Sequence, residues 1–168
     1  MGRMRPRTVV LLLVGLLVAG CGDDEPDAGS TGQDELVTPA EAVQRMEQLV
    51  VEVLRTAVPK KDPVLEKPAT DIPCGGPVGT ERSKIEATLT GAAGGPDAGI
   101  DPDESFAAVV ELLVGQGYQA TEPDESAGEP TLLATGPDGG LQLRWRADEQ
   151  TFWLSAETPC LDNPEHGE

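Results

Sequence analysis

Histidine and aromatic residues are the scarcest chemical groups in this sequence of 168 residues. The only histidine is His166, in the polar tail 163–168, so the chain lacks the imidazoles that histidine-dependent triads and most zinc sites use. Two Phe, two Trp and one Tyr are the only aromatic residues, which predicts a small hydrophobic core. We therefore expect neither a metal site nor a bound cofactor.

Other catalytic patterns are missing as well. Ser83, Ser105 and Ser155 lie in no recognisable nucleophile turn. The Gly-rich stretch Gly91–Gly99 has no lysine and no GxxxxGK pattern that would hold a phosphate. Carboxylates are abundant, but an acid-rich surface brings them together by chance, so none is singled out as a general acid. We predict that the chain is not an enzyme.

Basic residues are also few. The chain has 12 Lys and Arg against 30 Asp and Glu, and its net charge is −18. Three of the twelve are Arg3, Arg5 and Arg7, so a chain beginning after residue 20 has 12 − 3 = 9 basic residues and a charge of 9 − 30 = −21. Because like charges repel, we expect such a chain to avoid nucleic acid and anionic lipid head groups.

The first twenty residues have the features of a secretory signal. The three arginines are followed by the apolar run Val9–Val18, and the small residues Ala19 and Gly20 come next. A run of ten apolar residues is too short to cross a bilayer, which needs about 20. We therefore interpret residues 1–20 as a signal peptide that is removed.

The sequence Val18-Ala19-Gly20-Cys21 resembles the lipobox of bacterial lipoproteins, with Val18 where family members most often carry Leu. The resemblance implies that a dedicated peptidase cuts before Cys21 and that the Cys21 thiol carries a diacylglyceryl group. Two acyl chains anchor a protein stably, because burial is worth about 0.8 kcal/mol per CH₂. We expect the chain at the outer face of the cell membrane. The alternative is an ordinary cleaved signal with an incidental cysteine.

An acidic segment follows the lipidated cysteine. Residues 22–35 contain six acids, no base and no large apolar side chain. Such a sequence cannot bury enough surface to fold, so we interpret residues 21–36 as a disordered tether that holds a domain away from the membrane. A calcium site is the alternative for these acids, but their spacing does not match an EF-hand loop.

Two helices are predicted from capping residues and apolar spacing. The first begins with the capping box Thr38-Pro39-Ala40-Glu41 and ends before Pro59. The second begins at Asp101-Pro102 and ends at Gly115. Their predicted buried stripes recur at helical spacing and comprise Val43, Met46, Val50, Val53 and Ala57 in the first helix, and Phe106, Val109, Val110 and Leu113 in the second.

Five strands are predicted from alternating apolar residues, at 81–90, 118–121, 131–135, 141–146 and 151–157. Residues 59–80 are rich in proline and are expected to be irregular. A four-residue turn at 147–150 sets the last hairpin, with Arg144 opposite Trp153 and Leu143 opposite Leu154. The sequence thus predicts an α+β domain over 37–162, with two helices on one face of a mostly antiparallel sheet of about five strands.

The other two cysteines are Cys74 and Cys160, which flank the first and last of the predicted strands. Outside the cytoplasm such a pair predicts a disulfide, which would place those two strands side by side and antiparallel. A catalytic dithiol is the alternative, but the chain has no Cys-x-x-Cys.

A basic group is predicted on the polar face of the sheet. Four of the nine basic residues after position 20 alternate onto that face, namely Arg82, Lys84, Arg144 and Arg146, and Trp153 lies among them. One interpretation is a site for an anionic partner, or for a glycan whose sugar rings stack on Trp153. The alternative is a solvated face on which Arg144 covers Trp153 through a cation–π contact.

These features together favour a membrane-anchored, extracytoplasmic lipoprotein that acts as a non-catalytic binding or scaffolding module of the cell envelope. The acidic tether, the cysteine pair and the prolines before Cys74 and Cys160 resemble small orphan lipoproteins of high-GC Gram-positive bacteria, a resemblance that implies no particular activity. An envelope enzyme using carboxylates and a structural or regulatory partner of another membrane protein are the alternatives.

Overall fold

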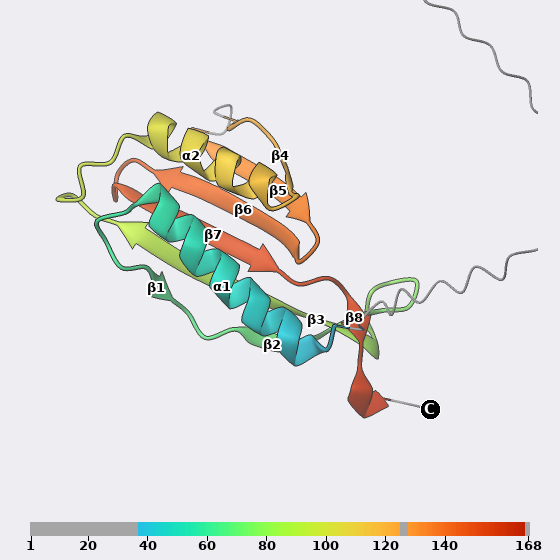
Figure 1. Cartoon of the computed structure of the whole chain (residues 1–168). Coiled ribbons are helices and arrows are strands. Elements are labelled where there is room, and N and C mark those ends of the chain that lie inside the picture. Colours follow the sequence, from blue (N-terminus) through green and yellow to red (C-terminus); the bar gives the residue numbers. More distant parts are fainter. Residues whose placement is uncertain (1–36, 125–127, 167–168) are drawn as a thin grey trace, which may run out of the picture. The chain divides into compact units, whose positions relative to one another are not determined.

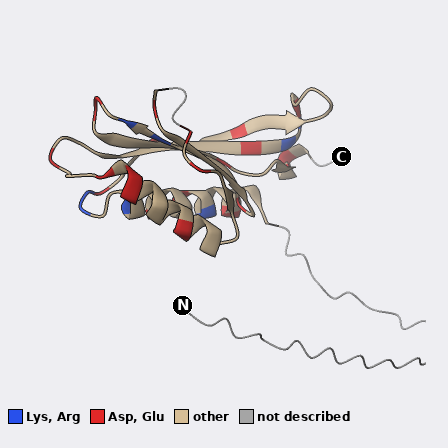
Figure 2. Cartoon of the chain, turned by 90° about the horizontal axis from the view of Figure 1, so that it is seen from above, with Lys and Arg blue, Asp and Glu red and all other residues tan. Residues whose placement is uncertain are grey.

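The structure is a computed structural model that describes residues 37–124 and 128–166. The predicted signal peptide, the predicted lipidation site Cys21 and the predicted acidic tether lie outside the described residues. Two helices lie on the same side of an antiparallel sheet, as Figures 1 and 2 show. The predicted α+β architecture is confirmed.

The first helix, α1, spans Pro39–Ala57 and has the predicted capping box. The Thr38 amide donates to the Glu41 carboxylate at 2.9 Å, and the Glu41 amide donates to the Thr38 hydroxyl at 3.3 Å. The Thr38 amide, and after it the Thr38 hydroxyl at 2.8 Å, donate to the Glu41 carboxylate and thereby lower the pKa of Glu41 below its usual 4.5. The apolar stripe of α1 is buried against the sheet, with Val50 and Val53 fully covered.

The second helix, α2, spans Pro102–Gly115 and begins at the predicted cap, because the Asp101 carboxylate accepts from the amides of Asp103 and Glu104. Its buried residues include Phe106 and Leu113. The Ser105 hydroxyl donates to the Ala57 carbonyl at 2.8 Å and thereby joins the two helices. Within the described part of the chain, neither helix is long and apolar enough to cross a membrane.

The sheet has eight strands, three more than the sequence predicted. Six of them form the order β1-β3-β7-β6-β5-β4, while β2 and β8 also pair with β3. The strands are β1 Val64–Leu65, β2 Ala69–Gly75, β3 Glu81–Gly94, β4 Gln119–Ala120, β5 Thr131–Gly136, β6 Gly139–Arg146, β7 Thr151–Glu157 and β8 Leu161–Asp162. A 3₁₀ turn, η1, follows at Pro164–His166 in the predicted polar tail.

Two stretches that lie outside the predicted strands belong to the sheet. The prolines of residues 59–80 do not prevent β1 and β2 from forming, because both strands lie on the edge of the sheet, where a missing N–H is tolerated. The strand β3 also continues through Gly91 to Gly94. A Cβ atom at Gly91 would lie 2.7 Å from Leu65 and 2.9 Å from Leu54, so this glycine allows α1 to pack closely on the strand.

The predicted register of the last hairpin is confirmed. Arg144 pairs with Trp153 and Leu143 pairs with Leu154 across β6 and β7. The first and last long strands, β3 and β7, are neighbours and antiparallel, also as predicted. Phe152 lies at the centre of the core, with its ring centroid 5.1 Å from that of Phe106 and 4.9 Å from that of Trp145.

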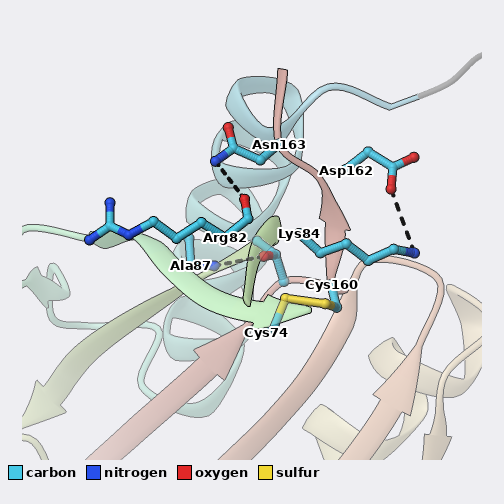
Figure 3. The surroundings of a disulfide bond; sticks show 8 residues. Cys74, Arg82, Lys84, Ala87, Cys160, Asp162 and Asn163 are labelled. Atoms are coloured by element: carbon cyan, nitrogen blue, oxygen red, sulfur yellow. Dashed lines mark hydrogen bonds and ion pairs between the residues drawn. A yellow bond between two sulfur atoms is a disulfide. The ribbon is translucent and has the colours of Figure 1, made fainter. Parts of the chain in front are cut away.

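The predicted disulfide joins Cys74 and Cys160, whose Cα atoms are 6.0 Å apart. Cys74 lies within β2, and Cys160 lies between β7 and β8. Ile85 of β3 pairs with Pro73 of β2 and with Leu161 of β8, so those two strands lie on opposite edges of β3. The disulfide therefore bridges across β3 (Figure 3).

Candidate functional site

One side of the sheet faces away from both helices (Figure 2), and the predicted binding residues Arg144, Arg146 and Trp153 lie on that side. Side chains alternate along a strand, so residues between the core positions of β3, β5, β6 and β7 point to this side. We call it the open face, and its members include Thr88, Thr90, Ala92, Leu133, Gln142, Arg144, Arg146, Trp153, Ser155 and Glu157. Most of them are polar, and Leu133 is 49% exposed.

A shallow hollow of about 270 Å³ lies on the open face around Trp153. Its lining includes Thr90, Gln142 and Ser155, which carry groups that both donate and accept hydrogen bonds, together with Arg144 and Arg146. Trp153 is half-buried between Arg144 of β6 and Ala92 of β3. The small side chain of Ala92 leaves the indole without a bulky neighbour on the β3 side.

The arginine that covers Trp153 is Arg146 and not Arg144. The Arg146 guanidinium carbon lies 5.4 Å from the centre of the indole ring. Arg146 is diagonally opposite Trp153 in the hairpin, and a side chain of this length reaches such a neighbour. The cation–π contact of the alternative interpretation is therefore present, but with a different partner from the one expected.

Glu149 holds both of these side chains in place. Its carboxylate accepts from Arg146 Nη1 at 2.8 Å and from Trp153 Nε1 at 3.0 Å. Sequence reasoning assigned Glu149 to the turn and gave it no role. Its position three residues after Arg146 and four before Trp153 is the signal that would have found it.

Glu129 supplies a second carboxylate at the open face. It lies 3.4 Å from Arg144 Nη1 and 3.7 Å from Arg146 Nε. The two arginines thus face two glutamates, and the local charge is balanced where the sequence suggested an excess of positive charge. Nothing in the sequence pointed to Glu129, because it comes from a segment just before β5 whose path is set by tertiary structure.

Arg82 and Lys84 are not brought together with Trp153. Lys84 pairs with Asp162 of β8 and forms an ion pair with it at 3.6 Å (Figure 3). Trp153 pairs with Ala92, which is eight residues further along β3 and so about 26 Å away at 3.3 Å per residue. Of the five residues predicted for the site, the structure groups only Arg144, Arg146 and Trp153.

Tyr118 and Glu41, which lie outside the open face, have shifted pKa values. The Tyr118 hydroxyl is 3.5 Å from the Asp138 carboxylate, and its burial, followed by the negative charge of Asp138, raises the pKa of Tyr118 to about 12. Tyr118 belongs to the core, and the other shifted group, Glu41, caps α1. Among the described residues no three His, Cys, Asp or Glu side chains form a group that could hold a metal ion.

Comparisons with known proteins add no relative. No family model matches the chain, and neither a curated protein nor a solved structure is similar enough to count as a match. The geometry of the open face is therefore what a functional proposal rests on.

Proposed function

We propose that this chain is a non-catalytic binding module whose open face holds an uncharged glycan around Trp153. The observation that carries the proposal is the arrangement of Trp153, Arg146 and Glu149, in which one carboxylate fixes an indole and a guanidinium. A side chain fixed before binding loses less entropy on binding, so it gives a stronger platform. The electron-rich face of an indole attracts the C–H groups of a sugar ring.

The surroundings of Trp153 favour a sugar over an anion. Sugar hydroxyls both donate and accept hydrogen bonds, and the hollow offers donors in the arginines and both donors and acceptors in Gln142, Thr90 and Ser155. The carboxylates of Glu129 and Glu149, which are paired with these arginines, are acceptors beside the hollow. An anion would compete with Glu129 and Glu149 for the arginines, and it would meet the field of a chain with a net charge of −18.

The proposal also includes a place in the cell. We propose that a lipid on Cys21 anchors the module at the outer face of the membrane, supported by Val18-Ala19-Gly20-Cys21 after a basic and then an apolar stretch. The test is the variant Cys21→Ala, expected to leave the membrane fraction or to keep residues 1–20. Mass spectrometry of the wild-type protein should show a modified N-terminal Cys21. An unmodified thiol at that position would overturn the anchor.

Glycan binding is tested with an array that carries both uncharged and sulfated oligosaccharides. Wild-type protein should retain uncharged glycans, with an affinity that changes little between low salt and physiological salt, because no net charge is neutralised. Trp153→Ala should weaken binding by about 1–3 kcal/mol, which is roughly five- to 150-fold. The matched control is Trp145→Phe, because Trp145 lies in the core and not on the open face.

Two outcomes would contradict the proposal that the open face binds an uncharged glycan. Preferential retention of sulfated glycans, with an affinity that falls as salt rises, would assign the hollow to an anionic partner instead. Unchanged glycan binding by the Trp153→Ala variant would show that the open face takes no part in recognition. The second result would leave the hollow as a solvated surface in which Glu149 merely braces the hairpin.

A further inference from the structure

A second concave site lies at the opposite end of β3 from Trp153. It is a cleft of about 340 Å³ between the first turn of α1, β2, β3 and β8. Its apolar lining comes from Val43, Ile85, Ala87 and Leu161, and its rim carries Asp71 and Glu165. We call it the end cleft. Its volume lies at the lower end of the range found for small-molecule sites.

The walls of the end cleft are held in place by the fold around Cys160. One extra residue separates the pairing of β7 with β3 from that of β8, since Glu157 pairs with Thr88 while Leu161 pairs with Ile85. Thr158 fills this irregularity, because its amide donates to the Ala87 carbonyl and its hydroxyl accepts from the Ala87 amide at 2.9 Å.

The disulfide and the chain end reinforce those walls. The Cys74–Cys160 bond ties the wall that β2 provides to the wall that precedes β8. The Asn163 amide group donates to the Arg82 carbonyl at 3.0 Å, and its backbone N–H donates to the Ser83 carbonyl at 2.9 Å (Figure 3). The cleft is thus lined by fixed backbone, which lowers the cost of ordering on binding.

The charge around the end cleft is of one sign. Three of its lining residues are acidic and none of those that the structure describes is Lys, Arg or His. The start of α1 offers an anion few amides, because Pro39 has no N–H and the Glu41 amide already donates to Thr38, which leaves the Ala40 amide in the first turn.

We propose that the end cleft binds a small organic cation with an apolar body, that is, a hydrophobic amine. The apolar part would lie on Val43, Ile85 and Leu161, and the ammonium group would face the carboxylates of Asp71 and Glu165. The net charge of −18 also raises the local concentration of cations near such an opening. This site is separate from the open face, so it does not depend on glycan binding.

The test compares three probes that share one ring, namely benzylammonium, benzyl alcohol and benzoate. Each is titrated into the full chain while methyl NMR signals of Val43, Ile85 and Leu161 are followed. Benzylammonium should give saturable shifts at these methyl groups, benzyl alcohol should bind more weakly, and benzoate should give none. Raising the salt concentration should weaken the binding of benzylammonium and not that of benzyl alcohol, because only the ammonium group has a charge interaction that salt screens.

Two charge-removing variants test the role of the rim. Asp71→Asn and Glu165→Gln should each weaken benzylammonium by about two- to fivefold and leave benzyl alcohol unchanged. Asn suits position 71, where φ is 61°, since Asn tolerates the left-handed conformation. The matched control is Asp148→Asn, which removes one exposed carboxylate from the turn between β6 and β7 and should have no effect.

The proposal is overturned if benzoate shifts the same methyl groups as strongly as benzylammonium, because charge would then not select the ligand. It is also overturned if no probe gives saturable shifts at Val43, Ile85 and Leu161, or if Asp148→Asn weakens benzylammonium as much as the two rim variants do. The last result would assign the attraction to the overall charge of the chain and not to this cleft.

Discussion

The two faces of the sheet are built from the same strands, and consecutive residues belong to opposite faces. Phe152 has no exposed surface and contacts two aromatic rings under the helices, whereas its neighbour Trp153 is half-buried on the open face. On the covered face the partners of a side chain are apolar and come from the helices and from neighbouring strands. On the open face they are charged groups that come from a turn and from the segment before β5.

The difference teaches where stability and recognition can be changed separately. Removing apolar surface from a closed core lowers the free energy of unfolding, because the cavity is only partly refilled. Exposed ion pairs contribute little to that free energy, because water and salt screen them. The open face is therefore expected to accept substitutions that alter binding while the fold persists.

The largest effect is expected from Phe152→Ala, which should lower the free energy of unfolding by about 3–5 kcal/mol. The adjacent change Trp153→Ala should lower it by about 1 kcal/mol or less, since it removes a half-buried side chain and one hydrogen bond. Urea denaturation followed by circular dichroism measures both. Equal losses would show that the two faces do not differ in this way.

The next largest effect is expected from removing the Cys74–Cys160 disulfide, which joins strands on either side of β3. The double change Cys74→Ser with Cys160→Ser should lower the free energy of unfolding by about 2–4 kcal/mol, because the unfolded chain gains the freedom that the closed loop denied it. Wild-type protein treated with dithiothreitol is the matched control and should lose a similar amount. Iodoacetamide labelling of either cysteine without prior reduction would contradict the bond.

A smaller loss is expected where a helix meets the covered face. Gly91→Ala should lower the free energy of unfolding by about 1–3 kcal/mol, because the new methyl group would collide with Leu65 and Leu54. Its neighbour Ala92 lies on the open face, and Ala92→Ser should change stability by no more than about 0.5 kcal/mol. A harmless Gly91→Ala would mean that α1 shifts easily and that the covered face is less tightly packed than described.

The smallest effect is expected at the capping box of α1, which lies on neither face of the sheet. The folded state holds the pKa of Glu41 below 4.5, so the capping box stabilises the fold above that pH and loses its contribution as the pH falls through the lowered pKa. Acid unfolding of Glu41→Gln should lack this part of the pH dependence, with Glu47→Gln on the same helix as a control. Identical acid profiles for wild type and Glu41→Gln would contradict the cap.

The features that the sequence predicted well are those with short-range causes. Thr38 and Asp101 specify helix starts through hydrogen bonds to amides at most three residues away. The alternation of Leu143, Arg144 and Trp145 leaves only one register for a hairpin with a four-residue turn. The disulfide was predicted from a count of cysteines and from the compartment that the predicted signal peptide implies.

The features that were missed depend on partners far away in the chain. The strand β2 contains Pro73 and exists because β3 offers it an edge, which no local pattern reveals. Glu129 reaches Arg144 only after β5 has paired with β6. The sequence also did not show how the Cys74–Cys160 disulfide lies in the fold, since the bond passes over β3 from one flanking strand to the other.

That crossing has a mechanical consequence. A force that pulls on the two ends of the chain passes through the sulfur atoms between residues 74 and 160, so the intervening chain is shielded from extension. The shielded length is large, because a sequence separation of 86 corresponds to about 300 Å of extended chain at roughly 3.5 Å per residue. Under load the oxidised domain therefore lengthens only through the chain before Cys74, which includes α1, and the chain after Cys160, and it gives up the remaining length only after a reductant has cut the bond.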